Sequence, residues 1–305
     1  MNYKEWPVIN YNKIQDTLET LHQWIQIIGK IRLNTMPWQN HSWHAPLYLS
    51  PKGFTTNPIP YKGIIFQIDL DFKRHKLIIE SSNMASVSMD LYPRTVSDFY
   101  NELYQILNKI NIDVKIHPFP NEIEPAVHFN KNQHQKSYDK EAINTIWQAM
   151  VKANEVFSVF RSNFIGKAGP VHLFWGGFDL AVTRFSGNDA PLYNSVIPNI
   201  PLDVMQEAYS KEVSSAGFWL GSKNFPTPVF YSYAYPGNAF YSKQIVQPIE
   251  AFWNHDLGEY LIKYEDIQKA ENPNEKLMEF LNSTYDAAAN TGSWNRNKLE
   301  KNNYE

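Results

Sequence analysis

The spacing of apolar residues along the chain changes between a period of about 3.6 and a period of 2, the repeats of helices and of strands. We predict a helix where apolar residues recur every three or four positions, and a strand where they alternate with polar residues. The predicted helices are residues 13–29, 95–110, 137–164, 202–209 and a last segment from residue 273. The predicted strands are residues 64–72, 75–81, 86–91, 171–175, 178–183, 212–221, 228–236 and 259–264. Runs of strands between long helices predict an α+β fold with antiparallel sheets and flanking helices.

Residues at the ends of the predicted helices match known capping patterns. Asn12 precedes the first helix, and Gly29 marks its predicted end. Thr95, with an acidic residue three positions later, resembles a capping box. Asn272 followed by Pro273 is typical of a helix start, because proline at the first helical position lacks only an amide that would be unpaired anyway.

The stretch 168–187 combines a strong strand pattern with chemically versatile side chains. Its apolar alternation is interrupted by Gly176 and Gly177, a pair that predicts a two-residue hairpin turn. The turn would assign one face to Val171, Leu173, Trp175, Phe178, Leu180 and Val182. The other face would carry His172 opposite Ala181, with Asp179 on the diagonal at roughly 7–8 Å. If the two glycines instead form a bulge in one long strand, this register does not hold.

Both halves of the chain show the same order of predicted elements: a long helix, a Gly-Lys pair, a strand entry with a histidine, several strands and a closing helix. This order suggests a duplicated helix, meander, helix unit. The proline-containing segment 117–136 is the best linker candidate. We therefore predict an N-terminal α+β half over 1–116 and a C-terminal α+β half over 137–305, either as two domains or as one compact two-lobed domain.

Composition excludes several classes of function. The 305 residues contain no cysteine, which excludes disulfides, thiolate catalysis and zinc sites with cysteine ligands. The net charge of −3 is spread over interspersed acidic and basic residues, so we expect no nucleic-acid partner. No stretch approaches the ~18 apolar residues of a membrane span, and the N-terminus lacks an apolar signal segment. We therefore expect a cytoplasmic protein with no membrane partner, whose oligomeric state the sequence leaves open.

Three histidines suggest a metal site. His41 and His44 lie in a predicted loop, and with His172 they would supply three ligands, to which Asp179 or Glu212 would add a carboxylate. Such a set suits zinc, iron or manganese, and an open position on the metal would support hydrolytic or oxygen-dependent chemistry. The alternative is that these histidines hydrogen-bond to the backbone at the edge of the loop. A divalent metal is therefore a candidate cofactor that the spacing alone does not establish.

A second set of residues is suited to an anionic ligand. An arginine combined with hydroxyl groups is a common way to hold a carboxylate or a phosphate. The set consists of Arg184, Ser186, Ser214 and Ser215, with Lys30, Arg32 and Lys167 from the two Gly-Lys regions. The alternative is a structural Arg184 that pairs with Glu212 or Asp179.

A third set is aromatic. Tyr231, Tyr233 and Tyr235 share one face of a predicted strand, and a face of three phenols is amphipathic. With Trp175 and Trp219, these rings are candidates to stack on a sugar or a heterocycle. The alternative, and the commoner case, is a sheet face that is covered by a helix.

Several long runs of sequence carry a family resemblance. They are NHSWHAPLYLSPKGFTT, LYPRTVSDFY, GKAGPVHLFWGGFDLAVTRFSG, EAYSKEVSSAGFW, FYSYAYP and STYDAAA. On these runs the chain resembles, over essentially its full length, a bacterial family catalogued as domain of unknown function 5996. The resemblance implies a soluble bacterial protein with no established activity and no assigned catalytic residue. Lys211 departs from the family pattern, which has a histidine there, and this weakens any scheme in which that position supplies a base or a ligand.

These observations support two hypotheses. The first is an enzyme that acts on a small polar or anionic metabolite, with His172, Asp179 and Glu212 as acid, base or ligand and Arg184 as an anion clamp. The second is a non-catalytic module that binds a small ligand or another protein through its aromatic faces. Convergence of the named polar groups in one place, with shifted pKa values, would favour the enzyme.

Overall fold

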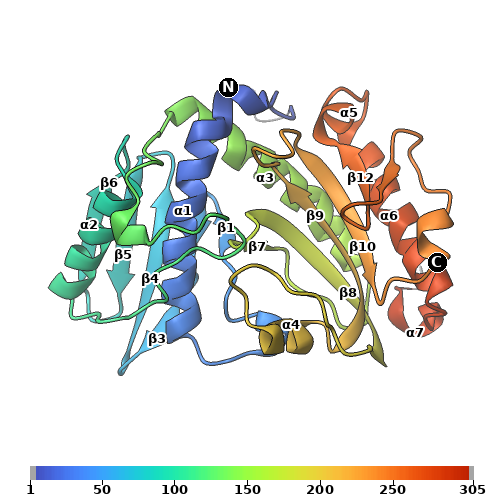
Figure 1. The fold of residues 1–305 in the computed structure, drawn as a ribbon, viewed down its shortest axis with the longest axis horizontal. Helices are drawn as coiled ribbons and strands as arrows, with labels where there is room; N and C mark the ends of the chain where they lie inside the picture. The colour runs from blue at the N-terminus through green and yellow to red at the C-terminus, as the bar shows by residue number, and fades with distance from the viewer. Residues whose placement is uncertain (1–4, 302–305) are drawn as a thin grey trace.

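Two six-stranded antiparallel sheets and the helices around them form the molecule (Figure 1). The structure is a computed structural model that describes residues 5–301. The predicted α+β class is confirmed. Within the described residues, no helix combines the length and the apolar character that crossing a membrane requires.

The first sheet comes from the N-terminal half and lies beside two helices, α1 (Tyr11–Thr35) and α2 (Val96–Lys109). Its strands are, in order across the sheet, β1 (Tyr48–Ser50), β2 (Gly53–Thr55), β4 (Ile64–Asp71), β5 (Lys76–Ser81) and β6 (Ser86–Asp90), and β3 (Ile59–Tyr61) also pairs with β4. The alternation predicted for β4 is confirmed, because Phe66, Ile68 and Leu70 are each 1% exposed. Thr95 caps α2 by accepting a hydrogen bond from the Asp98 amide, as predicted.

The second sheet comes from the C-terminal half and contains the predicted hairpin. Its strands are, in order, β11 (Phe252–Asn254), β12 (Glu259–Lys263), β10 (Val229–Tyr235), β9 (Lys211–Trp219), β8 (Asp179–Asp189) and β7 (His172–Phe174). The predicted register is confirmed, since His172 pairs with Ala181 across β7 and β8. The positive φ of this turn is at Phe178 (57°) rather than at either glycine, so the glycines have another role.

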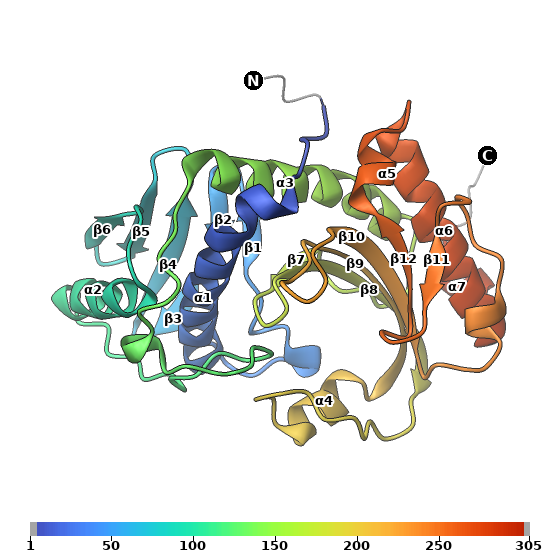
Figure 2. The ribbon, with the colours of Figure 1, turned by 45° about the horizontal axis from the view of Figure 1, so that its top comes forward.

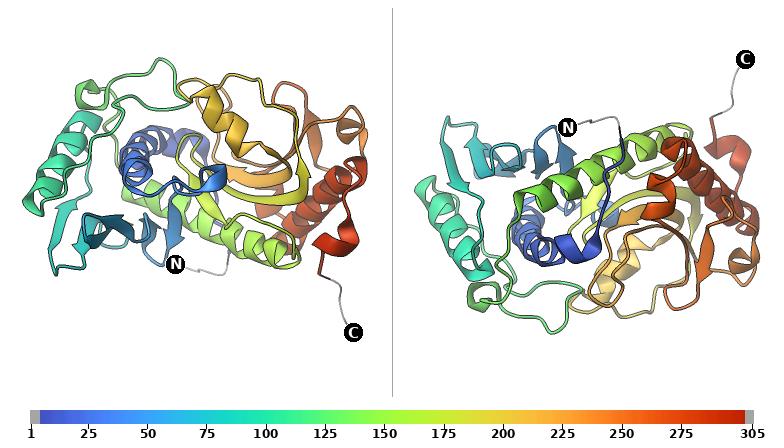
Figure 3. Two further views of the ribbon diagram at one scale, coloured as in Figure 1. Left: turned by 90° about the horizontal axis from the view of Figure 1, so that it is seen from below. Right: turned by 90° about the horizontal axis from the view of Figure 1, so that it is seen from above.

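Two long helices cover one face of the second sheet. They are α3 (Lys140–Ser162) and α6 (Pro273–Thr291), which Figure 3 shows on the side opposite to α4 (Leu202–Ala208). The predicted start of α6 is confirmed, because the Asn272 side chain accepts from the Glu275 amide. The face under α3 and α6 is dry, with Leu180, Val182 and Phe218 all fully buried. The remaining short helices are η1 (Asn40–Ser42), η2 (Phe129–Lys131), η3 (Tyr241–Lys243), α5 (Tyr264–Gln268) and α7 (Arg296–Leu299).

Helix α1 lies between the two sheets and continues past its predicted end (Figure 1). The prediction that the helix ends near Gly29 is wrong, because α1 runs to Thr35. Gly29 serves close packing instead: a Cβ at this position would lie 2.2 Å from Cδ1 of Trp175. His22 of the same helix also contacts the hairpin, with Nε2 3.0 Å and 2.8 Å from the carbonyl oxygens of Trp175 and Gly176. The β7–β8 hairpin is therefore docked on α1.

The two halves share a continuous hydrophobic core and a backbone connection. Leu47 and Leu173 exchange two hydrogen bonds, of 3.0 Å and 2.8 Å, which link the chain before β1 to β7. An internal duplication is not supported, because the second sheet is built in a different strand order from the first. The division into halves at 117–136 stays a prediction.

Candidate functional site

One face of the second sheet is polar and lies opposite to α3 and α6. It is turned toward α1 and α4 on the inner side of the curved sheet (Figure 2). Because side chains alternate along a strand, the residues between the buried apolar positions all emerge on this side. Adjacent strands pair Thr183 with Ser215 and Ser215 with Tyr233. We call this surface the polar face, and it consists of Asp179, Thr183, Ser215, Tyr231, Tyr233 and Glu259.

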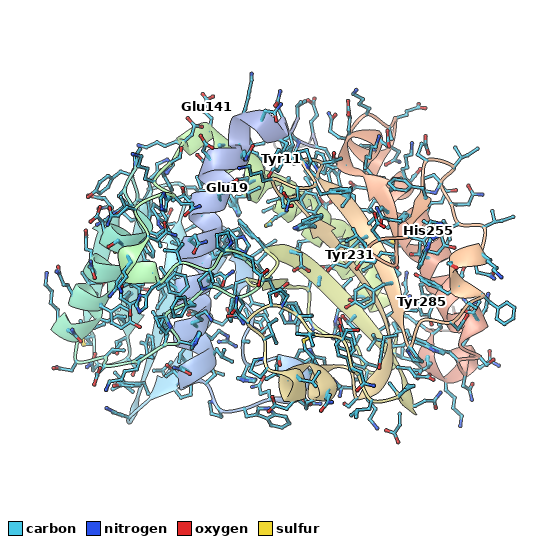
Figure 4. All side chains as sticks on the ribbon, in the orientation of Figure 1. Tyr11, Glu19, Glu141, Tyr231, His255 and Tyr285 are labelled. Carbon is cyan, nitrogen blue, oxygen red and sulfur yellow. The ribbon has the colours of Figure 1, made fainter. Side chains whose placement is uncertain are left out.

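A hydrogen bond between Tyr231 and Asp179 lies at the centre of the polar face. The Tyr231 hydroxyl donates to Oδ2 of Asp179 over 2.5 Å, a short distance typical of a hydroxyl on a carboxylate. Figure 4 labels Tyr231 on this sheet. The ring reaches across β9 at Gly217, where a Cβ would lie 2.3 Å from Cζ of Tyr231. Burial raises the pKa of Asp179 to about 6, although the hydrogen bond from Tyr231 opposes this shift.

Hydroxyl groups continue from this pair toward α4. Tyr233 and Tyr209 join their hydroxyls over 2.7 Å, and Thr183 and Ser215 do so over 2.8 Å. The rings of Tyr231 and Tyr233 are stacked, with 6.1 Å between centroids. The polar face therefore offers π surfaces together with a row of oxygen atoms.

Two further carboxyl groups flank Asp179. Glu259 is half-buried on β12, and burial together with the charge of Asp179 raises its pKa to about 8. Glu122 comes from the segment 117–136; much of the residue is exposed, but its carboxylate lies against the hairpin turn. Desolvation and the charge of Asp179 raise the pKa of Glu122 to about 7. Asp179, Glu122 and Glu259 therefore all titrate close to neutral pH.

The two hairpin glycines make room for Glu122. A Cβ at Gly176 would lie 2.0 Å from Oε1 of Glu122, and a Cβ at Gly177 would lie 3.0 Å from Oδ1 of Asp179. Helix α1 holds the neighbouring backbone, because Gln26 accepts from the Asn121 amide over 2.7 Å and donates to its carbonyl over 2.9 Å. The glycine pair therefore permits the close approach of a carboxylate rather than a special turn conformation.

No cation of the described chain neutralises this cluster. None of the ion pairs formed within residues 5–301 includes Asp179, Glu122 or Glu259. Desolvation raises the pKa of all three groups, and the charge of Asp179 raises those of Glu122 and Glu259 further, because like charges that are close together repel one another. The arrangement can accept hydrogen bonds, attract a cation and exchange protons near neutral pH.

Arg184 is not part of the polar face. It emerges on the opposite face, is 2% exposed, and has its guanidinium carbon 3.5 Å from the ring centroid of Phe160 and 4.3 Å from that of Tyr285. Its Nη2 donates to the Phe160 carbonyl. The structure therefore separates Arg184 from both of its expected carboxylate partners, Asp179 and Glu212, and surrounds it with rings that favour a cation.

The three histidines of the expected metal site have different partners. Nδ1 of His41 lies 3.0 Å from the Ala208 carbonyl, and Nδ1 of His44 lies 3.2 Å from the Gln39 carbonyl. His172 is 1% exposed and its ring contacts that of Phe174. Within residues 5–301, no three His, Asp or Glu side chains are arranged to hold a metal ion. For His41 and His44 the geometry matches the backbone-bonded alternative.

The other expected site residues are divided between several places. Ser186 donates to Glu212 over 2.6 Å at the end of β8, away from Asp179 in register. Ser214 is buried on the face under the helices, and Trp175 donates from Nε1 to the Ala45 carbonyl over 2.9 Å in the core. Trp219 lies opposite Asp179 in register and stacks on Phe225. Of the expected residues, the structure brings together Asp179, Ser215, Tyr233 and Trp219 on one face of the sheet, and His172 emerges on the same face from the edge strand β7.

Sequence reasoning missed the two flanking acids. Glu122 lies in the segment interpreted as a linker, and nothing local marks it as a neighbour of Asp179. Glu259 had a detectable signal, because the alternation in 259–264 assigns it to the polar side of a strand. The pairing of β12 with β10, which brings it beside the tyrosines, is a long-range contact.

Comparisons with known proteins give one match. The profile described as Family of unknown function (DUF5996) matches residues 6–301. No curated protein and no solved structure matches the chain.

Proposed function

The chain belongs to this family of unknown function, and we propose, from the site itself, that the polar face binds a small organic cation such as an amine. One observation carries the proposal: Glu122 and Glu259 lie close enough to Asp179 for its charge to raise their pKa values, and none of the three belongs to an ion pair in the described chain. Clustered carboxyl groups that destabilise one another are a feature of binding and catalytic sites.

A bound cation would relieve the repulsion among the carboxyl groups. A positive charge within roughly 4–6 Å of a carboxylate favours its ionised form. The cost of holding three acids together in the free protein would therefore be recovered in the complex. The same charge disfavours an anionic metabolite, so a cationic ligand, which the sequence did not suggest, fits this face better than the anionic part of the predicted ligand range.

The tyrosines add a second source of affinity for a cation. An ammonium group within about 6 Å of an aromatic ring gains roughly 0.5–2 kcal/mol from the ring quadrupole, most where water is excluded. Tyr231 and Tyr233 present stacked, half-buried rings beside Asp179. The hydroxyls of Thr183 and Ser215 are available to orient hydrogen-bonding groups of the ligand.

Proton transfer is the second candidate function, and one observation favours it. Asp179 has a pKa raised to about 6 and already shares a hydrogen bond with a phenol. A carboxyl group that titrates near neutral pH is suited to act as a general acid or base. An enzyme that moves a proton on a bound amine would use the same residues, so binding is the first property to measure.

The binding test uses isothermal titration calorimetry with four probes: tetramethylammonium, 1,4-diaminobutane, glucose and acetate. We expect the two cations to bind to the polar face and acetate not to displace them. Affinity should rise between pH 6 and pH 8, because Asp179, Glu122 and Glu259 lose their protons over this range and the cation pairs with the ionised form.

The variant that tests the site is Asp179→Asn, which keeps the size of the side chain and removes its charge. Losing a charge-assisted interaction should weaken cation binding at least about tenfold. Asp113→Asn serves as the matched control and should bind like the wild type, because this aspartate is exposed and its backbone bonds to Tyr61 of the first sheet. Preferential binding of glucose, or equal cation affinity in Asp179→Asn, would contradict the proposal.

A further inference from the structure

A second group of unpaired polar side chains lies at the seam between the two sheets. Arg32 emerges from the last turn of α1, and His172 emerges from β7. They flank the Tyr48 ring of β1, whose centroid is 5.6 Å from the Arg32 guanidinium carbon and 6.3 Å from the His172 ring centroid. The seam is the place where Leu47 and Leu173 join the two halves.

Arg32 is a buried charge without a counter-ion. It is 4% exposed and belongs to none of the ion pairs within residues 5–301. Its Nη1 donates to the Thr56 carbonyl over 2.5 Å, whereas its Nε is buried with no hydrogen-bond partner in the described chain. The carbonyl end of α1 supplies only a partial negative charge. Arginine keeps its proton even when buried, so the charge persists.

His172 adds an unpaired ring nitrogen at the same place. It is 1% exposed, and its Nδ1 is buried without a hydrogen-bond partner in the described chain. Burial and the positive charge of Arg32 lower the pKa of His172 to about 3, so the ring is neutral and has one N–H to donate. The Nε–H of Arg32 and Nδ1 of His172, which donates in the tautomer that carries the proton there, are two unsatisfied buried groups beside one ring, and each retains its full desolvation penalty.

Buried polar groups without a partner indicate that a partner is missing, and here a negative partner matches the charge of Arg32. We propose that Arg32, His172 and Tyr48 bind a small oxyanion, an inorganic phosphate or a carboxylate, at the seam between the two sheets. The guanidinium fork and a ring N–H are donors that suit tetrahedral and planar oxyanions alike. Because α1, β1 and β7 each contribute one side chain, the anion would stabilise the contact between the halves.

This anion site is independent of the cation site on the polar face. His172 and Asp179 emerge on the same side of the hairpin, but Phe174 lies between them in register and takes the T-shaped contact with His172. Arg32 affects the pKa of His172 and does not appear among the groups that shift the pKa of Asp179. Failure of one proposal therefore leaves the other unaffected.

The test is equilibrium dialysis of the full chain against radiolabelled phosphate and, separately, labelled acetate, with chloride setting the ionic strength. We expect one bound oxyanion per chain and a melting temperature that rises with its concentration. Binding of phosphate alone or of acetate alone would assign the anion type. If neither binds to the wild type, the proposal is overturned.

Two variants locate the site. Arg32→Gln removes the charge, and His172→Phe removes both ring nitrogens while keeping a ring against Phe174; each should weaken oxyanion binding at least about tenfold. His172→Phe should also fold in anion-free buffer, since it eliminates an unsatisfied buried group. His255→Phe, an exposed histidine at the far side of the second sheet (Figure 4), is the matched control. Unchanged affinity in His172→Phe would overturn the assignment.

Discussion

At the scale of single residues, the polar face depends on a glycine at position 217 of β9. Gly217 has no Cβ, and so the Tyr231 ring can cross β9 and place its hydroxyl on Asp179. The consequence is electrostatic. The phenol stabilises the ionised carboxylate, while burial destabilises it, and the pKa of Asp179 is set by the difference.

Tyr231→Phe should separate these two effects. The variant keeps the ring over Gly217 and removes the hydrogen bond, so the pKa of Asp179 should rise above its value of about 6. A hydrogen bond to a charged group is worth about 1.5–3 kcal/mol, which corresponds to a rise of roughly one to two pKa units. The pKa of Asp179 is measured in both proteins from the ¹³C chemical shift of its carboxyl group as a function of pH. An unchanged pKa would show that the hydroxyl does not donate to Asp179.

At the scale of elements, α1 shows how tertiary packing overrides a local signal. Glycine is the second-worst helix former and often ends a helix, which is why the sequence suggests an end at Gly29. In the folded chain, the Trp175 indole occupies the space that a Cβ would need. The helix continues because α1 and the β7–β8 hairpin pack together at this point, and Gly29 is the residue that allows it.

Gly29→Ala should therefore destabilise the protein. Alanine gains about 1 kcal/mol in helix propensity, but overpacking against Trp175 should cost about 1–3 kcal/mol. We expect a lower free energy of unfolding in urea, and a smaller loss when the same change is made in a Trp175→Phe background. A net stabilisation by Gly29→Ala would mean that the indole moves aside at no cost.

At the scale of the whole molecule, two sets of titratable groups with shifted pKa values have opposite effects on stability. His22 and His172 have pKa values lowered by burial to about 4 and about 3, so they favour the folded state increasingly as the pH rises toward 6.5. Glu122 and Glu259 have raised pKa values, and the folded state binds their protons more tightly than the unfolded chain does. Of these four residues, only Glu122 and Glu259 still change their protonation above pH 6.5.

Stability should consequently fall between pH 6.5 and pH 8. The folded chain holds protons that the unfolded chain has already lost, so the free energy of unfolding decreases as the folded groups ionise. The contribution of the half-buried Glu259 to this decrease is roughly 1 kcal/mol. Glu259→Gln should flatten the pH dependence of the melting temperature in this range. Glu141→Gln, an exposed position labelled in Figure 4, should not.

Much of the local structure was predictable because it depends on contacts between residues that are close in sequence. The caps at Thr95 and Asn272, the alternation in β4 and the register of His172 with Ala181 all follow from a few neighbouring side chains. The predicted sites were less complete. Asp179 and Tyr233 were found because strand alternation puts them on one side, and the same alternation could have added Glu259.

The sequence by itself determined the α+β class, the hairpin and which residues face outward on each strand, since a period of 2 or 3.6 selects a face without reference to the rest of the chain. Only the tertiary structure decided which faces meet. It placed Arg184 among rings, brought Glu122 to the hairpin and left Arg32 and His172 at the seam without partners. Burial and charge act through space, so groups that are far apart in sequence acquire shifted pKa values only when the fold places them together.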